Sequence, residues 1–136
     1  MTFLDRIKKS EGYRSRIYRC TADYLTIGYG FAIKDLELSE RVCDIIVEEK
    51  EQKILKKVRR FEWFDSSPEL IQEVVKEMVY NLGYSGFKKF KRTIYYLETE
   101  QYSEAADEML DSRWARQVKN RAIEMSNEVR SCEKNR

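Results

Sequence analysis

The sequence predicts an α+β fold that is mainly helical, with a single small β region close to the N-terminus. Residues 13–33 are rich in Tyr, Ile and Thr, the residue types that favour strands. Apolar residues recur at helical spacing over 40–61 and again over 70–82, so a long helix and a core helix follow the strands. At 136 residues the chain can form one compact unit, or two small lobes that share an element.

The first element is predicted to be a helix over about residues 3–11. Thr2 suits the N-cap position and Asp5 follows at the third helical position, so the two residues can form a capping box. Gly12 is a natural helix stop. Glu11 therefore lies on the last turn, where the negative end of the helix dipole disfavours a charged carboxylate.

A β-hairpin is predicted next, from a strand over 13–19 and a second strand that begins at residue 24. The residues between them are small and polar, as in a turn. Gly28 and Gly30 indicate a bend or a close approach of the backbone to another group. A third short strand is expected near 31–33.

The long helix over 40–61 begins after Ser39, which is a good N-cap. Lys50 and Lys53 interrupt its apolar stripe, which indicates a helix that is exposed at its centre and joins two packed ends. We therefore expect a single domain over 1–136, with a small β-containing lobe at about 12–60 and a helical lobe made of about 1–11 and 61–136.

Helices are expected through the rest of the chain. Pro68 suits the first helical position after Ser67, and Gly83 suits the end of that helix, before a turn over 83–86. Shorter helices are predicted over 87–97, over 103–110 with Ser103 as cap, after Ser112 near Trp114, and over 122–129 with Asn120 as cap. Residues 131–136 are expected to fray.

Composition excludes several kinds of chemistry. The chain has no histidine, so it holds no Ser-His-Asp triad, no Cys-His dyad and no His-ligated metal. Cys20, Cys43 and Cys132 form no CxxC pair, and their odd number argues against a disulfide framework. We therefore expect reduced thiols, no metal site and no cofactor.

The charge is distributed unevenly along the chain. The whole sequence has 26 basic and 24 acidic residues, hence +2, whereas residues 1–33 have six basic and three acidic residues, hence 6 − 3 = +3. This basic first third suits a polyanionic partner. The sequence has no run of 18 apolar residues, and its first ten residues are too polar for a signal peptide. The product is therefore expected to start in the cytoplasm.

Three residues of the first third could carry acid–base or nucleophilic chemistry. Glu11 could act as a general acid at the end of its helix. Cys20 lies at the predicted hairpin turn, beside Arg19, which could lower the pKa of the thiol. Thr26 lies on the returning strand. Taken singly, the three are more simply a solvated carboxylate, a small apolar residue and a good strand residue.

The spacing of these residues resembles that of a known family. The segment EGYRSRIYRCTADYLTIGYGFAI is similar to the active-site segment of tailed-phage lysozymes of the T-even type, glycoside hydrolase family 24. Glu11 and Thr26 fall in register with the family motif, whereas Cys20 stands at the family aspartate and Phe31 at its histidine. The stretches EMVYNLGYSGFKKFKRTI and YSEAADEMLDSRWARQVKNRA also resemble the family, so the resemblance covers about 1–33 and 74–130.

The resemblance implies a two-lobed lysozyme fold with a long connecting helix. It also implies hydrolysis of the β-1,4 bond between N-acetylmuramic acid and N-acetylglucosamine in peptidoglycan, as an endolysin for host cell lysis. Glu11 would protonate the leaving oxygen, Arg121 of the NRA motif would pair with Glu11, and Thr26 would help to hold the attacking water. Asn81 is expected either to line the cleft or to end its helix, and Trp114 to pack in the core rather than bind sugar.

Cys20 leaves the mechanism open. The family aspartate would activate water or stabilise positive charge on the sugar, and an ordinary thiol is mostly neutral at pH 7. A thiolate could act as a base, which gives inversion, or as a nucleophile, which gives retention. The alternative is a catalytically degenerate module that binds peptidoglycan without cutting it. Because Glu11, Thr26 and Arg121 are all in place, the active enzyme is favoured.

The expected partner is the peptidoglycan glycan strand, which the protein would reach from the host cytoplasm after the membrane is permeabilised. We expect a monomer that binds no nucleic acid and has no stable membrane association. The basic runs KKVRR (56–60) and KKFKR (88–92) raise a nucleic-acid-binding alternative. Such runs are more often solvated helix faces, and the neutral second half of the chain speaks against it.

Overall fold

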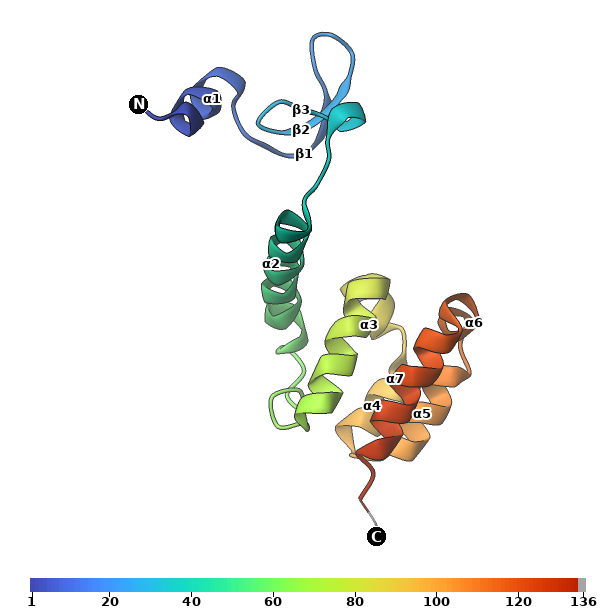
Figure 1. Cartoon of the computed structure of the whole chain (residues 1–136). Coiled ribbons are helices and arrows are strands. Elements are labelled where there is room, and N and C mark those ends of the chain that lie inside the picture. Colours follow the sequence, from blue (N-terminus) through green and yellow to red (C-terminus); the bar gives the residue numbers. More distant parts are fainter. Residues whose placement is uncertain (135–136) are drawn as a thin grey trace. The chain divides into compact units, whose positions relative to one another are not determined.

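The computed structural model describes residues 1–134, and its contacts divide the chain into two compact units. The first unit is Met1–Asp44 and the second begins at Ile45. Helices account for most of the described chain, and a three-stranded antiparallel sheet lies in the first unit (Figure 1). The predicted fold class, α+β and mainly helical, is confirmed.

The first unit combines one helix with the sheet. Its elements are α1 (Phe3–Glu11), β1 (Arg14–Arg19), β2 (Leu25–Gly28), β3 (Phe31–Ala32) and the 3₁₀ turn η1 (Ile33–Asp35). The strands lie in the order β1-β2-β3, so Thr26 on the central strand pairs with Tyr18 on one side and Ala32 on the other. The predicted hairpin and third strand are both confirmed.

Helix α1 has the ends that the sequence predicts. The Thr2 hydroxyl accepts a hydrogen bond from the Asp5 N–H, and the Asp5 carboxylate accepts one from the Thr2 N–H, both at 3.1 Å. Gly12 ends the helix at a φ of 71°. The contacts group α1 with the sheet. The expected packing of residues 1–11 with the helical lobe would join the two units, and it stays a prediction.

Helix α2 (Glu40–Val58) begins in the first unit and continues in the second. The Ser39 hydroxyl accepts from the Val42 N–H at 3.2 Å, so the predicted cap is confirmed. The predicted end at Phe61 is wrong, because the Phe61 N–H bonds to the Val58 carbonyl in a tighter turn. The Phe61 ring then stacks on Trp63 with a centroid distance of 5.1 Å, so the chain turns to half-bury two aromatic rings.

The second unit contains the remaining helices. These are α3 (Glu69–Lys88), α4 (Lys91–Glu98), α5 (Tyr102–Leu110), α6 (Arg113–Val118) and α7 (Asn120–Ser131). Helix α7 packs against α3, α5 and α6, and α5 also packs against α4 (Figure 1). None of the helices within residues 1–134 has both the length and the apolar character needed to cross a bilayer.

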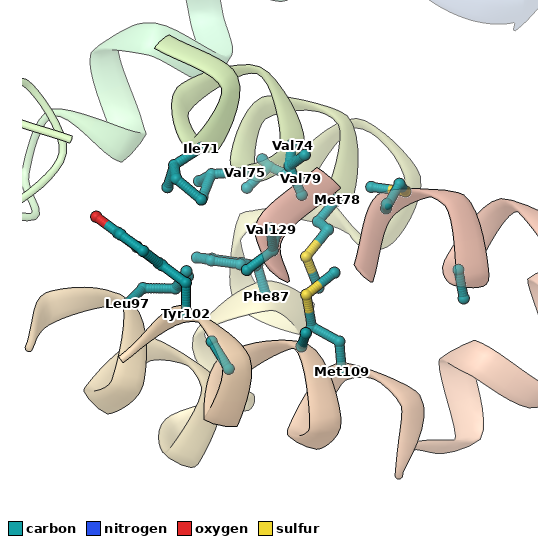
Figure 2. Packing of buried hydrophobic residues seen from close by; sticks show 14 of the residues in the cluster. Ile71, Val74, Val75, Met78, Val79, Phe87, Leu97, Tyr102, Met109 and Val129 are labelled. Atoms are coloured by element: carbon teal, nitrogen blue, oxygen red, sulfur yellow. The ribbon is translucent and has the colours of Figure 1, made fainter. Parts of the chain in front are cut away.

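The main hydrophobic core lies in the second unit. Helix α3 contributes the buried residues of the predicted apolar stripe, Ile71, Val74, Val75, Met78 and Val79. Figure 2 shows these side chains above Leu97, Met109 and Val129, with the Met78 and Met109 side chains pointing toward each other. The helical spacing over 70–82 therefore predicted the core face correctly.

Two predicted boundaries around α3 are wrong. Pro68 lies at the N-cap, one residue before the first helical position, and the Ser67 hydroxyl donates to the Trp63 carbonyl instead of capping the helix. Gly83 does break the helix, at a φ of 76°. The chain resumes a helical course after it and reaches Lys88, because this extra turn carries Phe87 into the core, where it is fully buried.

The caps predicted for α5 and α7 are also wrong. Ser103 lies inside α5, and Asn120 is the first helical residue of α7, after Lys119 at the N-cap. The start of α5 is capped from the other end of the unit, since the Glu133 carboxylate accepts from the Tyr102 and Ser103 N–H groups at 2.6 and 3.2 Å. The predicted fraying is therefore wrong at Glu133, and its remainder at 135–136 lies outside the described residues.

Removing this carboxylate should destabilise the second unit. We expect Glu133→Ala to lower the free energy of unfolding by about 1 kcal/mol, because two N–H groups at a helix start lose their acceptor and the dipole loses its counter-charge. Urea unfolding followed by circular dichroism measures the change. Glu133→Gln keeps an acceptor oxygen and should lose less. Equal stability of wild type and Glu133→Ala would contradict the capping role.

Candidate active site

Glu11 is held against a glycine in a turn that joins two strands of the sheet. The residue ends α1, and Gly12 then redirects the chain into β1. Across the unit, the carboxyl group lies against the α-carbon of Gly30, in the turn between β2 and β3: a methyl group added there would lie 2.8 Å from Glu11 Cδ. Gly30 also has a φ of 76°, so both the close approach and the backbone conformation require glycine.

Cys20 lies at the turn between β1 and β2. The Cys20 N–H donates to the Tyr24 carbonyl at 3.0 Å, which closes the turn. The thiol is half-buried, and hydrogen bonds from the Tyr24 backbone, the Thr26 hydroxyl and the Ala22 backbone lower its pKa. This environment favours the thiolate through hydrogen bonding to the charged form.

Thr26 is the buried partner of that thiol. Its side chain comes from the central strand and is 3% exposed, and it alone among residues 1–44 is fully buried. Its hydroxyl donates to the Tyr24 carbonyl at 2.9 Å. A hydroxyl has one proton to donate, so Thr26 can bond either to this carbonyl or to a Cys20 thiolate at a given moment. The hydroxyl orientation is therefore coupled to the ionisation of Cys20.

Asn81 belongs to the second unit and is tied to a core residue. Its side-chain oxygen accepts from the Trp114 indole N–H at 2.7 Å. Trp114 is 4% exposed, and its ring meets Phe90 edge to face at a centroid distance of 6.0 Å. The prediction that Trp114 packs in the core is confirmed. Asn81 thus has a structural contact, and its expected contact with substrate stays a prediction.

The Asn81–Trp114 bond should stabilise the fold. We expect Asn81→Ala to lower the free energy of unfolding by about 1–3 kcal/mol, because a buried indole N–H loses its acceptor. Asn81→Asp keeps that oxygen and serves as the matched control. Thermal unfolding measures both variants, and an unchanged midpoint in Asn81→Ala would show that water or another group replaces the bond.

Arg121 is paired with a residue that sequence reasoning missed. Its Nε lies 2.7 Å from the Glu77 carboxylate, so the ion pair joins α7 to α3 within the second unit. The predicted pairing of Arg121 with Glu11 involves both units and stays a prediction. The signal for Glu77 was weak, because a partly exposed glutamate on the edge of an apolar helix is ordinary in sequence.

The structure thus groups the predicted residues by unit. The first unit brings Cys20 and Thr26 into contact and holds Glu11 against Gly30, whereas Asn81 and Arg121 belong to the second. All three cysteines are free thiols. Among residues 1–134, no group of three or more cysteine and acidic residues could hold a metal ion.

The helical core and the small sheet agree with the comparison to known families, as does the first unit, which holds Glu11 against Gly30 and brings Cys20 into contact with Thr26. A family model described as phage lysozyme matches residues 8–130, a range that includes every residue of the candidate site. The chain therefore belongs to the phage lysozyme family. Its class is that of the peptidoglycan-degrading glycoside hydrolases. A search of curated proteins found no match.

Proposed function

We propose that the protein is a muramidase that hydrolyses the β-1,4 bond between N-acetylmuramic acid and N-acetylglucosamine. The observation that carries this proposal is the Glu11 carboxyl held against Gly30, in the same small unit as the Cys20–Thr26 contact. Glycosidases of this kind need one group that gives a proton to the leaving oxygen and a second that assists on the sugar carbon. Glu11 and Cys20 supply groups of these two types.

Glu11 is proposed as the general acid. A protonated carboxyl transfers its proton to the glycosidic oxygen as the bond to the sugar carbon breaks, so the leaving sugar departs as a neutral alcohol. The contact with Gly30 restricts where the carboxyl can lie, because the glycine backbone blocks one side of it. Such positioning lowers the entropy cost of the proton transfer.

Cys20 and Thr26 are proposed to act on water. The Cys20 thiolate accepts one proton from the attacking water as the water oxygen bonds to the sugar carbon, and Thr26 helps to hold that water. Hydrogen bonds that lower the pKa of Cys20 raise the thiolate fraction near neutral pH. This route gives inversion of configuration. Direct attack by the thiolate would instead give retention, through a thioglycoside that water then hydrolyses.

The second unit is proposed to assist in binding the glycan. Arg121 is a cation that could hold Glu11 or an acidic group of the substrate, and its ion pair with Glu77 keeps its guanidinium oriented. Asn81 retains its amide N–H₂ group as a donor for an acetamido oxygen while its own oxygen binds Trp114. Both roles follow from the family resemblance together with the chemistry of these side chains.

In its biological setting the protein is proposed to act as a phage endolysin. It would accumulate in the host cytoplasm as a monomer and degrade the cell wall after the inner membrane is permeabilised. The basic first third suits anionic peptidoglycan. We propose no nucleic-acid partner and no stable membrane association.

The test is the release of new reducing sugar ends from purified, insoluble peptidoglycan. We expect the wild type to release reducing ends in an amount that grows with time and with enzyme concentration. A specific observation favours a second candidate, because Cys20 replaces the family aspartate: the chain could bind glycan without cutting it. Co-sedimentation with peptidoglycan and no release of reducing ends would support that binding module and reject the muramidase.

A further inference from the structure

Three aromatic rings come from the two chain segments that meet where Glu11 touches Gly30. Tyr13 follows Glu11 by two residues, and Tyr29 and Phe31 are the chain neighbours of Gly30. The rings contact one another in a row, since Tyr13 and Tyr29 have a centroid distance of 5.7 Å, and Tyr29 and Phe31 one of 6.3 Å. We call these three residues the aromatic row.

Two rings of the aromatic row are exposed and the third, Tyr29, is half-buried, in contrast to the phenylalanines of the helical core. Tyr13 is 68% exposed and Phe31 44%, whereas Phe64 and Phe87 are fully buried in the helical core. The Phe31 ring also rests against Gly28, where an added methyl group would lie 2.7 Å from two ring carbons. Gly28 therefore provides room for this ring beside the site, just as Gly30 does for the Glu11 carboxyl.

The chemistry of the aromatic row fits a carbohydrate. Exposed ring faces bind the apolar C–H faces of sugar rings, and binding sites commonly combine such aromatic surface with a few polar groups. Lys8 supplies a charge over the middle ring of the row, with its Nζ 5.8 Å from the Tyr29 ring centroid. Its ammonium suits the carboxylates of the stem peptide, which is joined to N-acetylmuramic acid through an amide of the lactyl group.

We propose that the aromatic row is a glycan-binding platform that seats an N-acetylated amino sugar beside the bond that Glu11 protonates. The proposal rests on the proposed function for the identity of the glycan and deepens it by naming the surface that positions this substrate. Tyr13, Tyr29 and Phe31 are positioning residues, since they bind sugar without taking part in proton transfer. Lys8 contributes preference for muramic acid units that carry an acidic stem peptide.

Binding to an inactive enzyme tests the platform separately from catalysis. In a Glu11→Gln background, isothermal titration with a soluble hexamer of β-1,4-linked N-acetylglucosamine measures Kd for Tyr13→Leu, Tyr29→Leu and Phe31→Leu. Each change should raise Kd about three- to tenfold, because one ring contact is lost while apolar bulk is kept. Tyr29→Phe keeps the ring and should bind like the parent. Tyr95→Leu removes an exposed ring of the helical unit and is the matched control.

The other possible outcomes distinguish a failure of the glycan-binding platform from a failure of the proposed muramidase activity. Unchanged Kd in the three leucine variants would overturn the platform, and so would a fall in melting temperature with unchanged binding, because the rings would then serve only folding. No detectable binding by the Glu11→Gln parent would overturn it as well. Ring-dependent binding together with no cleavage by the wild type would retain the platform and reject the muramidase.

A second arm tests Lys8. Lys8→Gln should weaken binding of soluble peptidoglycan fragments that carry acidic stem peptides, and should leave the Kd for the neutral hexamer unchanged. Equal losses of affinity for both ligands would contradict a charge-based preference at Lys8.

Discussion

Glu11→Gln is expected to abolish hydrolysis of peptidoglycan, with a loss of about 10²- to 10⁴-fold in the rate of reducing-end release. Glutamine has nearly the same shape as glutamate, so the contact with Gly30 can persist, but an amide cannot give up a proton to the leaving oxygen. The loss should appear in kcat, while binding to peptidoglycan is kept.

The control for this variant is Glu37→Gln, which changes an exposed glutamate of the same unit. It should retain wild-type activity, and both variants should melt at the wild-type temperature. If Glu11→Gln retained more than about a tenth of the wild-type rate, it would have lost less than general acid catalysis typically contributes, and the role of Glu11 as proton donor would be wrong.

Cys20→Ala is expected to have the second large effect, again about 10²- to 10⁴-fold, because the water loses its base. Cys20→Asp introduces a carboxylate, the group that the resemblance to phage lysozymes implies at this position. It should keep activity to within about tenfold of the wild type. Cys43→Ala removes an exposed free thiol of α2 and should have no effect. An active Cys20→Ala would show that the thiol is a bystander.

The pH dependence of the wild type provides an independent check on Cys20. Hydrogen bonds from the Tyr24 backbone and from Thr26 hold the pKa of the thiol below its usual range. The rate should therefore rise with pH as the thiolate forms, and this rise should occur at lower pH than for an ordinary cysteine. In Cys20→Asp the rise should move to still lower pH, since an aspartate ionises near pH 4. An identical rise in both proteins would contradict the assignment.

The lowered pKa of Cys20 also makes the stability of the fold depend on pH. A thiol whose pKa is lower in the folded than in the unfolded protein stabilises the fold at pH values above its unfolded pKa, and this contribution is lost as the pH falls through the folded pKa. Because the Cys20 site lies near the surface, solvent screening keeps the contribution small. Activity rather than unfolding is therefore the informative measurement here.

The sequence predicted the fold correctly where residues close to one another in the chain determine an element. The capping box of α1 and the apolar stripe of α3 depend on residues close in sequence, and the structure has both. The errors arose where distant contacts decide. The cap of α5 comes from Glu133, about 30 residues away, and the extra turn after Gly83 exists because the core takes Phe87.

The site shows the same division. The spacing of Glu11, Cys20 and Thr26 was visible in the sequence, whereas their contacts were not. That Gly30 is the neighbour of Glu11, and that Thr26 bonds to the Cys20 thiol, follow from how α1 and the strands pack. Only a weak signal in the sequence pointed to Glu77, because its partner Arg121 lies 44 positions away along the chain.

The most direct test of the proposed muramidase activity is the chemical identity of the new sugar ends. Peptidoglycan is digested with the wild type, the new reducing ends are converted to alcohols with borohydride, and the products are analysed by mass spectrometry. We expect the new ends to be reduced N-acetylmuramic acid, and Glu11→Gln to release at least about a hundredfold fewer of them. New ends made of reduced N-acetylglucosamine would contradict the proposed bond, and no new ends at all would contradict the enzyme.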